Sequence, residues 1–458
     1  MRKQGFRRQL SILHFSLLIL NEAKGRLVAH RPLEGVRVAD LTWLLAGAGG
    51  PRLLASLGAE VIRIEWKDRL DFLRYMPPFA PNKGERAEKA GALEMTGLSK
   101  DSAKSVNRAG FFNDVNAGKR GISLNMGHPK GRELFKRLVG VSDVVVEAFT
   151  AETMRKWGLG YDQLKAIKDD IIYIQQPGWG YKGPYVKFVS YGPVAQAASG
   201  LTEQSGLPAP YPPAGWGFSY MDWSGAYYCA ISVLCAIYYK KRTGKGQYLD
   251  CSQVEPGIYM TGAALLDSLI NGRSSQRTGN RSPYKLAAPH GAYQCRGADR
   301  WIAIAVTTDD EWKALVREMG TPAWSQAEKF SSLAARLVHQ DELDQLVGQW
   351  TNELEPFALQ ARLQKAGVPA GVCQTAQDRV ERDPQLQHLK WLIPLHHSEI
   401  GEWPVKDVPF HFTNSIVNQG GPTERAAPCY GEDSDYVYDE LLKLTKQEKA
   451  ELVKEGVI

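Results

Sequence analysis

Short apolar runs rich in Val and Ile recur through the first 250 residues, separated by segments of mixed polarity. Runs of this length are typical of strands that are buried on both faces of a parallel sheet. A segment with helical periodicity at 129–139 lies between two of the runs. Such alternation predicts an α/β protein with a doubly wound, Rossmann-like sheet. The predicted strands cover residues 36–40, 59–65, 121–125, 144–148, 171–175 and 247–250.

The pattern changes after a bridge rich in Gly, Ser, Arg and Pro at 272–290. A hairpin at 292–306 is followed by three amphipathic segments, which predicts a smaller α+β domain. A strand-rich piece near 392–412 and a last polar helix at 434–455 close the chain. We therefore expect a large domain, a small domain with its linkers, and a C-terminal return to the large domain. Their expected bounds are 32–271, 272–390 and 391–458.

The first 31 residues differ from the rest of the chain. Basic residues precede an apolar run at 10–20 that contains His14, and no small-residue cleavage pattern follows. The run is also too short to cross a bilayer as a helix. We interpret residues 1–31 as an N-terminal extension, expected to be disordered, rather than as an export signal or membrane anchor.

Composition narrows the class of protein further. Charged residues make up 23% and hydrophobic residues 43% of the chain, which is typical of a soluble globular protein. The net charge of +6 is spread without a dense basic run, so we expect no nucleic-acid partner. The six cysteines form no CxxC pair and the histidines no HExxH motif, so we expect a cytoplasmic protein without a metal site.

Asp222 stands at the start of a long apolar segment, 226–239, that ends in basic residues and glycines. These are the start and stop signals of a helix. One interpretation is that Asp222 is a helix N-cap. The other is a carboxylate nucleophile whose ionised form is favoured by the amides at the helix start. The segment alone leaves both interpretations open.

A glycine-rich stretch at 45–50 follows the first predicted strand, and the next strand ends in Glu65. We interpret the stretch as a tight turn, with a helix starting at Pro51. The arrangement resembles a dinucleotide fingerprint. However, Arg52 stands where that motif needs its third glycine for close packing of helix and strand. We therefore expect no nicotinamide-dependent activity.

Eight motifs occur in order between residue 32 and residue 458. They are residues 32–42, 57–65, 116–125, 195–201, 242–247, 367–371, 431–435 and 455–458. With these motifs the chain resembles the class III coenzyme A transferases, a family that includes the formyl-CoA and carnitine CoA transferases.

The resemblance implies an interlocked dimer of two-domain chains, with Asp222 as the catalytic residue. It also implies transfer of CoA from an acyl-CoA to an organic acid through an aspartyl anhydride and an aspartyl-CoA thioester, which is covalent catalysis. We expect a homodimer, although some members of the family work as heteromeric pairs. CoA would be a substrate, with no permanently bound cofactor.

Tyr191 distinguishes this chain from the related acyl-CoA racemases and epimerases. The racemases pair their aspartate with a histidine, which would match position 191. An ordinary tyrosine has a pKa of about 10 and is a poor base at neutral pH. It can still donate a hydrogen bond to an oxyanion. Tyr191 therefore favours a transferase, with a racemase or a partner subunit of a heteromeric transferase as alternatives.

Leu45 stands where formyl-CoA transferase has a glutamine that contacts the acyl group. The loss of that amide predicts an apolar wall, unsuited to formate or oxalate. Aromatic residues cluster around Asp222, at 216, 218, 220 and 223. We expect a larger, partly hydrophobic or aromatic acid, such as one like benzylsuccinate.

Five further residues match family positions near the nucleotide part of CoA. Cations would bind its phosphates, and an aromatic ring would stack on its adenine. We assign these roles, by resemblance, to Trp66, Lys67, Asn116, Lys119 and Arg120.

Overall fold

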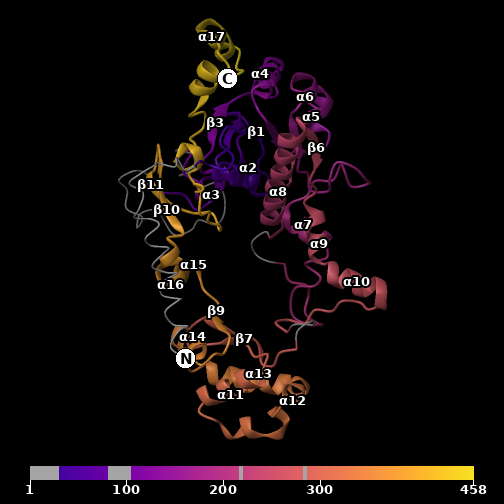
Figure 1. The fold of residues 1–458 in the computed structure, drawn as a ribbon, viewed down its shortest axis with the longest axis vertical. Helices are drawn as coiled ribbons and strands as arrows, with labels where there is room; N and C mark the ends of the chain where they lie inside the picture. The colour runs from indigo at the N-terminus through magenta and orange to yellow at the C-terminus, as the bar shows by residue number, and fades with distance from the viewer. Residues whose placement is uncertain (1–29, 81–104, 216–219, 282–285) are drawn as a thin grey trace.

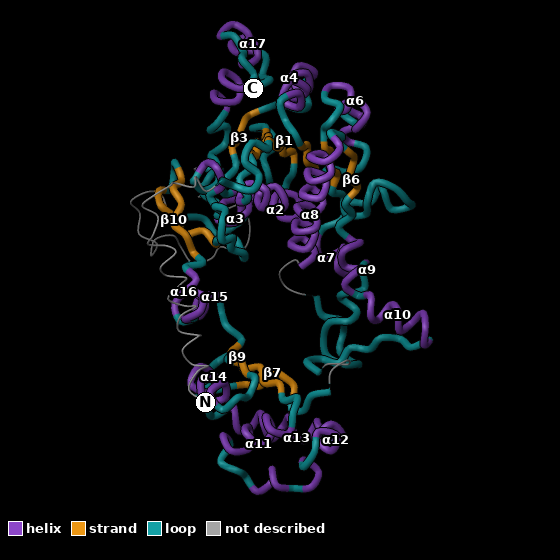
Figure 2. Tube along the Cα trace, in the orientation of Figure 1, coloured by secondary structure: helices purple, strands orange, loops and turns teal. Residues whose placement is uncertain are grey.

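A computed structural model describes residues 30–80, 105–215, 220–281 and 286–458. The predicted extension at 1–31 therefore lies almost wholly outside the described residues. Figure 1 shows a large domain above a smaller one, joined by two connections on opposite sides of the view. In Figure 2 much of both connections is drawn as loop, with short helices along them.

The large domain is built on a six-stranded parallel sheet with the order β3-β2-β1-β4-β5-β6. This confirms the predicted α/β class, and the predicted strands agree within one or two residues. The order reverses between β1 and β4, the point at whose carboxyl edge such folds bind ligands. The strands are β1 (Arg37–Leu41), β2 (Glu60–Glu65), β3 (Arg120–Ser123), β4 (Val144–Glu147), β5 (Ile172–Gln175) and β6 (Gln247–Asp250).

Helices cover both faces of the sheet because successive strand residues point to opposite sides. Val38 and Val61 face a core shared with α2 (Leu44–Ser56) and α8 (Tyr220–Thr243). On the other face, strand residues pack on the helices after β3 and β4. The remaining helices of this domain are α3 (Gly110–Asn116), α4 (Pro129–Gly140), α5 (Thr153–Lys156), α6 (Tyr161–Ile167), α7 (Gly192–Ala198), α9 (Val254–Met260) and α10 (Gly262–Asn271).

The predicted turn at 45–50 is wrong, because these residues lie inside α2. The glycines serve helix packing rather than a turn. A Cβ built on Gly49 would lie 2.7 Å from the Cβ of Ala226, and one on Gly50 would lie 2.8 Å from the Sγ of Cys229. The absent side chains let α2 and α8 run side by side in nearly direct backbone contact. We call this contact the glycine seam.

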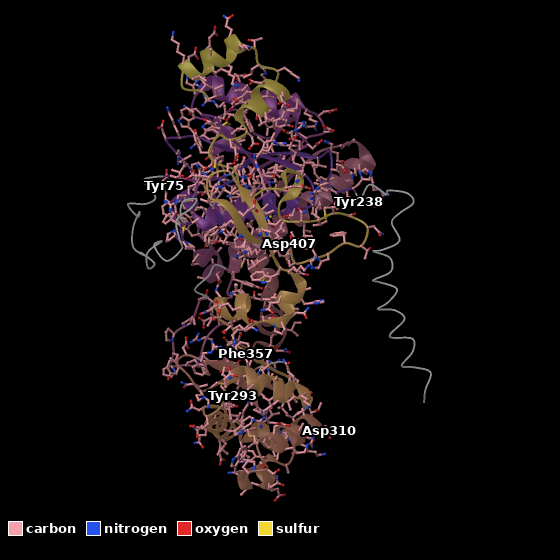
Figure 3. The ribbon with its side chains drawn as sticks, turned by 90° about the vertical axis from the view of Figure 1, so that its left-hand side faces the viewer. Tyr75, Tyr238, Tyr293, Asp310, Phe357 and Asp407 are labelled. Carbon is pink, nitrogen blue, oxygen red and sulfur yellow. The ribbon has the colours of Figure 1, made fainter. Side chains whose placement is uncertain are left out.

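The small domain has a three-stranded antiparallel sheet with helices against it. This agrees with the predicted hairpin and amphipathic helices. Figure 3 shows Tyr293, Asp310 and Phe357 in this domain. Its elements are β7 (His290–Gln294), β8 (Trp301–Ala305), β9 (Ala370–Val372), α11 (Asp309–Glu318), α12 (Leu333–Val338), α13 (Gln340–Thr351) and α14 (Pro356–Lys365).

After the small domain the chain runs through α15 (Ala376–Glu381), where Asp378 pairs with Arg300 of the small domain, and α16 (Pro384–Leu389). The hairpin of β10 (Leu392–His397) and β11 (Gly401–Lys406) follows. The last part of the chain, with Val437 and Tyr438, packs in the core of the large domain.

The single helix predicted at 434–455 is divided into a π-helical turn, Tyr436–Leu441, and α17 (Lys446–Lys454). Lys443 has a φ of +55°, which ends the first piece, and a capping box at Thr445 starts the second.

Candidate active site

Asp222 is the third residue of α8 rather than its N-cap, because the helix already begins at Tyr220. Asp222 is therefore a residue of the first helical turn and not the N-cap. Unpaired amides at a helix start favour a negative charge there. The side chain is partly buried. A carboxylate in this position is suited to stay ionised and to act as a nucleophile.

Two glutamines from neighbouring strand ends converge on this turn. Gln253, which follows β6, donates a hydrogen bond from Nε2 to Oδ1 of Asp222 over 2.5 Å. Gln176, which follows β5, is buried, and neither polar atom of its side chain has a partner within the described residues. A Cβ on Gly225 would lie 3.1 Å from Nε2 of Gln176 and 3.2 Å from Cγ of Gln253. The two side chains therefore flank the same spot on α8.

Sequence reasoning missed both glutamines, although a signal was present. Gln176 directly follows one predicted strand, Gln253 lies three residues after another, and the carboxyl ends of parallel strands meet at one edge of the sheet.

The glycine seam relates Leu45 to Asp222. Leu45 lies one helical turn before Gly49, and Asp222 lies one turn before Ala226. Since Gly49 and Ala226 are in contact, the two residues lie at the same end of the paired helices. Leu45 is buried in an apolar cluster that also contacts Trp223. The role of Leu45 as an apolar wall of the substrate site stays a prediction.

Tyr191 directly precedes α7, and its side chain is 63% exposed. Helix α7 packs on the start of α8, with Ala195 against Met221. The structure thus brings the element that carries Tyr191 to Asp222, while the contact of Tyr191 with a substrate stays a prediction. Trp216 and Phe218 lie outside the described residues.

A cavity of about 370 Å³ lies at the carboxyl ends of β1, β2, β3 and β4, next to the point where the strand order reverses. Trp43, Phe149 and Trp157 form a chain of edge-to-face rings with centroids 6.2 and 5.5 Å apart. The cavity is lined by Leu41, Trp43, Ile64, Glu65, Trp66, Arg69, Leu124, Asn125, Met126, Gly127, Phe149, Thr150, Thr153 and Trp157.

Cations stand over two of the indole rings near this cavity. The guanidinium carbon of Arg69 is 5.5 Å from the ring centre of Trp43, and Nζ of Lys67 is 5.2 Å from that of Trp66. Flat apolar walls with cations at the rim suit a nucleotide. Trp66 lines this cavity together with Trp43, Arg69 and Phe149, while its contact with adenine stays a prediction. Trp43, Arg69 and Phe149 also follow the ends of predicted strands, so the same rule could have found them.

Lys119 is completely buried and binds inside the protein. Its Nζ donates to Asp40 Oδ2 (2.9 Å), to Asn116 Oδ1 (3.0 Å) and to the carbonyl of Ala48 (2.9 Å). Burial lowers the pKa of Lys119 to about 8, against the opposing effect of the Asp40 carboxylate. The three bonds join β1, α2 and α3.

Arg120 is half-buried and holds the C-terminal segment. It forms ion pairs with Glu60 (3.0 Å) and Asp433 (3.1 Å), and its guanidinium lies 4.0 Å from the ring centre of Tyr436. Neither Arg120 nor Lys119 nor Asn116 lines the cavity at the sheet edge. Their assignment to CoA binding stays a prediction.

Within the described ranges, no cluster of His, Cys, Asp and Glu side chains is arranged to hold a metal ion. No helix in the same ranges is long and apolar enough to cross a membrane.

The family model for CoA-transferase family III matches residues 33–434, so the chain belongs to this family. Two of the curated relatives from Chloroflexus aurantiacus illustrate the similarity. The chain is 30% identical to succinyl-CoA–D-citramalate CoA-transferase, covering 93% of this chain and 98% of that protein. It is 26% identical to the beta subunit of succinyl-CoA–L-malate CoA-transferase, with the same coverage.

The fold has a solved counterpart in a CaiB/BaiF family protein from Brucella suis. That structure has a TM-score of 0.77 and 29% identity, and covers 90% of this chain and 100% of the other. The predicted resemblance is thereby confirmed: the chain is a family III CoA-transferase that uses CoA thioesters as substrates.

Proposed function

We propose that this protein transfers CoA from an acyl-CoA donor to a free carboxylic acid through covalent intermediates on Asp222. The observation that carries the proposal is the position of Asp222 in the first turn of α8, with the amide of Gln253 on its carboxylate. The helix start stabilises the charge of the nucleophile, and the amide fixes its orientation.

The reaction divides into four displacements. A carboxylate oxygen of Asp222 attacks the thioester carbon, the C–S bond breaks, and an anhydride and CoA thiolate form. The thiolate then attacks the Asp222 acyl carbon and expels the donor acid. The acceptor carboxylate attacks the resulting aspartyl-CoA thioester and releases thiolate again. Finally the thiolate takes the new acyl group and frees Asp222.

The cavity at the β1–β4 edge is the proposed site for the nucleotide part of CoA. Trp66 would stack on the adenine, and Lys67 with Arg69 would neutralise phosphate charge. Stacking of a base on an aromatic side chain contributes about 1–3 kcal/mol.

The acid is proposed to have an apolar or aromatic body, because Leu45 and Trp223 form an apolar wall near Asp222. Two cations lie beyond this wall. Nζ of Lys406 is 4.2 Å from the ring centre of Trp223, and the guanidinium of Arg52 is 6.0 Å from it. Both cations already pair with Asp114, at 2.8 Å for Lys406 and 3.9 Å for Arg52, and a second, distal carboxylate of the acid is proposed to share them. The acids named for the relatives are dicarboxylic. A benzylsuccinate-like acid combines both features.

Assembly is proposed to be homodimeric. Helix α10 exposes a run of large apolar side chains, among them Leu269 at 73% and Ile270 at 74%. Exposed apolar surfaces of this kind mark interaction sites. One relative is a beta subunit, so a heteromeric partner is the alternative.

A donor and acceptor panel tests the proposal. Purified full-length protein is incubated with succinyl-CoA, benzylsuccinyl-CoA, formyl-CoA or oxalyl-CoA and free acids, and mass spectrometry follows Asp222. We expect CoA exchange and an adduct on Asp222, with the aromatic diacid preferred. A preference for formate or oxalate contradicts the substrate class. Deuterium uptake at the α-carbon without exchange would instead indicate a racemase.

A further inference from the structure

We propose that Gln253 is a catalytic residue that stabilises the oxyanion formed on Asp222 itself. The inference rests on the proposed function and assigns a separate task to each oxygen of the carboxylate. Gln253 already donates to Oδ1 over 2.5 Å. The bond to the acyl group therefore forms on Oδ2, and Oδ1 remains as the carbonyl oxygen of the covalent intermediates.

The two inner displacements both occur at the acyl carbon of Asp222. When CoA thiolate or the acceptor carboxylate adds to this carbon, the C=O electron pair moves to Oδ1 and gives a tetrahedral oxyanion. When the leaving group departs with its bonding pair, the carbonyl re-forms. Charge thus appears on Oδ1 twice in each turnover. A donor that is held there beforehand stabilises these transition states without reorganisation.

The surroundings of Gln253 support this task. Its side chain is buried, so its amide acts in a low-dielectric environment where a hydrogen bond to a charge is strong. It lies three residues after the end of β6 and is the N-cap residue of α9, so its backbone is held between two regular elements. A donor of this kind is preorganised rather than recruited by the substrate.

Gln176 is the second amide of this arrangement. Its side chain is buried, and it has no partner for either polar atom within the described residues. Buried amides are normally paired, so one left open beside the nucleophile requires an explanation. Both glutamines contact the position where Gly225 has no side chain. The two amides therefore flank α8 at Gly225, one turn after Asp222.

The test compares Gln253→Met with the wild type in the full-length protein. Succinyl-CoA is mixed with the enzyme, the reaction is quenched at short times, and mass spectrometry measures the CoA adduct on Asp222. We expect formation of this adduct to slow by about 100-fold, as for loss of an oxyanion donor. The anhydride would then persist and react with water, so the ratio of succinyl-CoA hydrolysis to CoA transfer should rise.

This ratio separates catalysis from mere positioning. If Gln253 only orients Asp222, the first attack also slows, and hydrolysis and transfer fall together. Equal loss of both rates, or adduct formation at the wild-type rate, overturns the inference. If the wild type forms no Asp222 adduct with any donor of the panel, the proposed function itself fails.

Two further variants guard against misfolding. Gly225→Ala would press a Cβ against both amides while favouring the helix, and should shift the ratio in the same direction by about 10-fold or less. The matched control is Gln340→Met, which changes a buried glutamine of α13 in the small domain. We expect that control to leave both rates unchanged.

Discussion

Two carboxylates near the carboxyl edge of the sheet, one buried and one partly buried, differ in how they are bound. Asp40, in β1, has no exposed surface and pairs with Lys119 at 2.9 Å, with Arg63 at 3.9 Å. Asp222, in α8, is held by the neutral amide of Gln253 beside the unpaired amide of Gln176. The first pairs with opposite charges, and the second accepts a hydrogen bond from a neutral amide.

This difference separates residues that build the fold from residues that react. A buried ion pair fixes both partners, because removing either leaves a bare charge in a low-dielectric interior. A carboxylate held by an amide keeps its charge available for attack. The family motif at 116–120 therefore has a clear structural role in this chain, in which Lys119 ties β1 to α2 and α3.

The largest expected effect comes from Asp222→Asn. The amide cannot act as the nucleophile, so transfer should fall by at least about 10⁴-fold while the melting temperature changes little. Exchange assays and thermal unfolding measure both. The matched control is Asp310→Asn, an exposed acid in the first turn of α11, which should leave transfer unchanged. Retained transfer in Asp222→Asn would contradict the covalent mechanism.

Lys119→Met should affect the stability of the fold, because it removes the ion-pair partner of Asp40. It leaves Asp40 buried without this partner, and should lower the free energy of unfolding by about 3–5 kcal/mol. Urea unfolding measures the change, with Lys313→Met as the exposed control. A raised KM for acyl-CoA with unchanged stability would instead show that Lys119 serves CoA.

Glu147 offers an intermediate case, a buried carboxyl held by Gln175, Tyr173 and the amide of Phe149. Burial raises its pKa from 4.5 to about 7. The folded protein therefore retains this proton between these pH values while the unfolded chain loses it. Stability should fall as pH rises through this window and change no further above it.

Glu147→Gln tests this dependence. The variant should lack the part of the free energy of unfolding that changes with pH because of Glu147. This part amounts to at most about 3 kcal/mol between pH 5 and pH 8. Urea unfolding at both pH values measures it, with the exposed Glu353→Gln as control. Identical pH profiles in the variant and the wild type would exclude the contribution.

The smallest effect is expected for Trp66→Ala at the edge cavity. Loss of base stacking should raise KM for acyl-CoA by about 10-fold with kcat nearly unchanged. Initial-rate kinetics test it, and Trp301→Ala in the small domain is the control. A fall in kcat at constant KM would show that Trp66 acts in the chemical step rather than in binding of acyl-CoA.

Much of the architecture could be predicted because it depends on local patterns. Buried strands are rich in β-branched residues, and α8 has an acid in its first turn and basic residues in its last turn. The candidate nucleophile was therefore visible in the sequence, and the ordered motifs gave its family.

The remaining features depend on contacts between distant residues. The glycines at 47–50 predict a turn unless the position of Ala226 and Cys229 is known. Gln176 and Gln253 are 77 positions apart and meet only because β5 and β6 are neighbours. The burial of Lys119 likewise depends on Asp40, which lies 79 positions away.

The glycine seam also has a consequence for motion. Helix α8 cannot leave α2 without opening the core beneath both, so its amides should exchange with deuterium as slowly as those of β1. Helix α10, with its exposed apolar side chains, should exchange much faster in the monomer. Asp222 therefore lies on the part of the fold that is expected to open least often. The position of its carboxylate should stay fixed while other parts of the chain fluctuate.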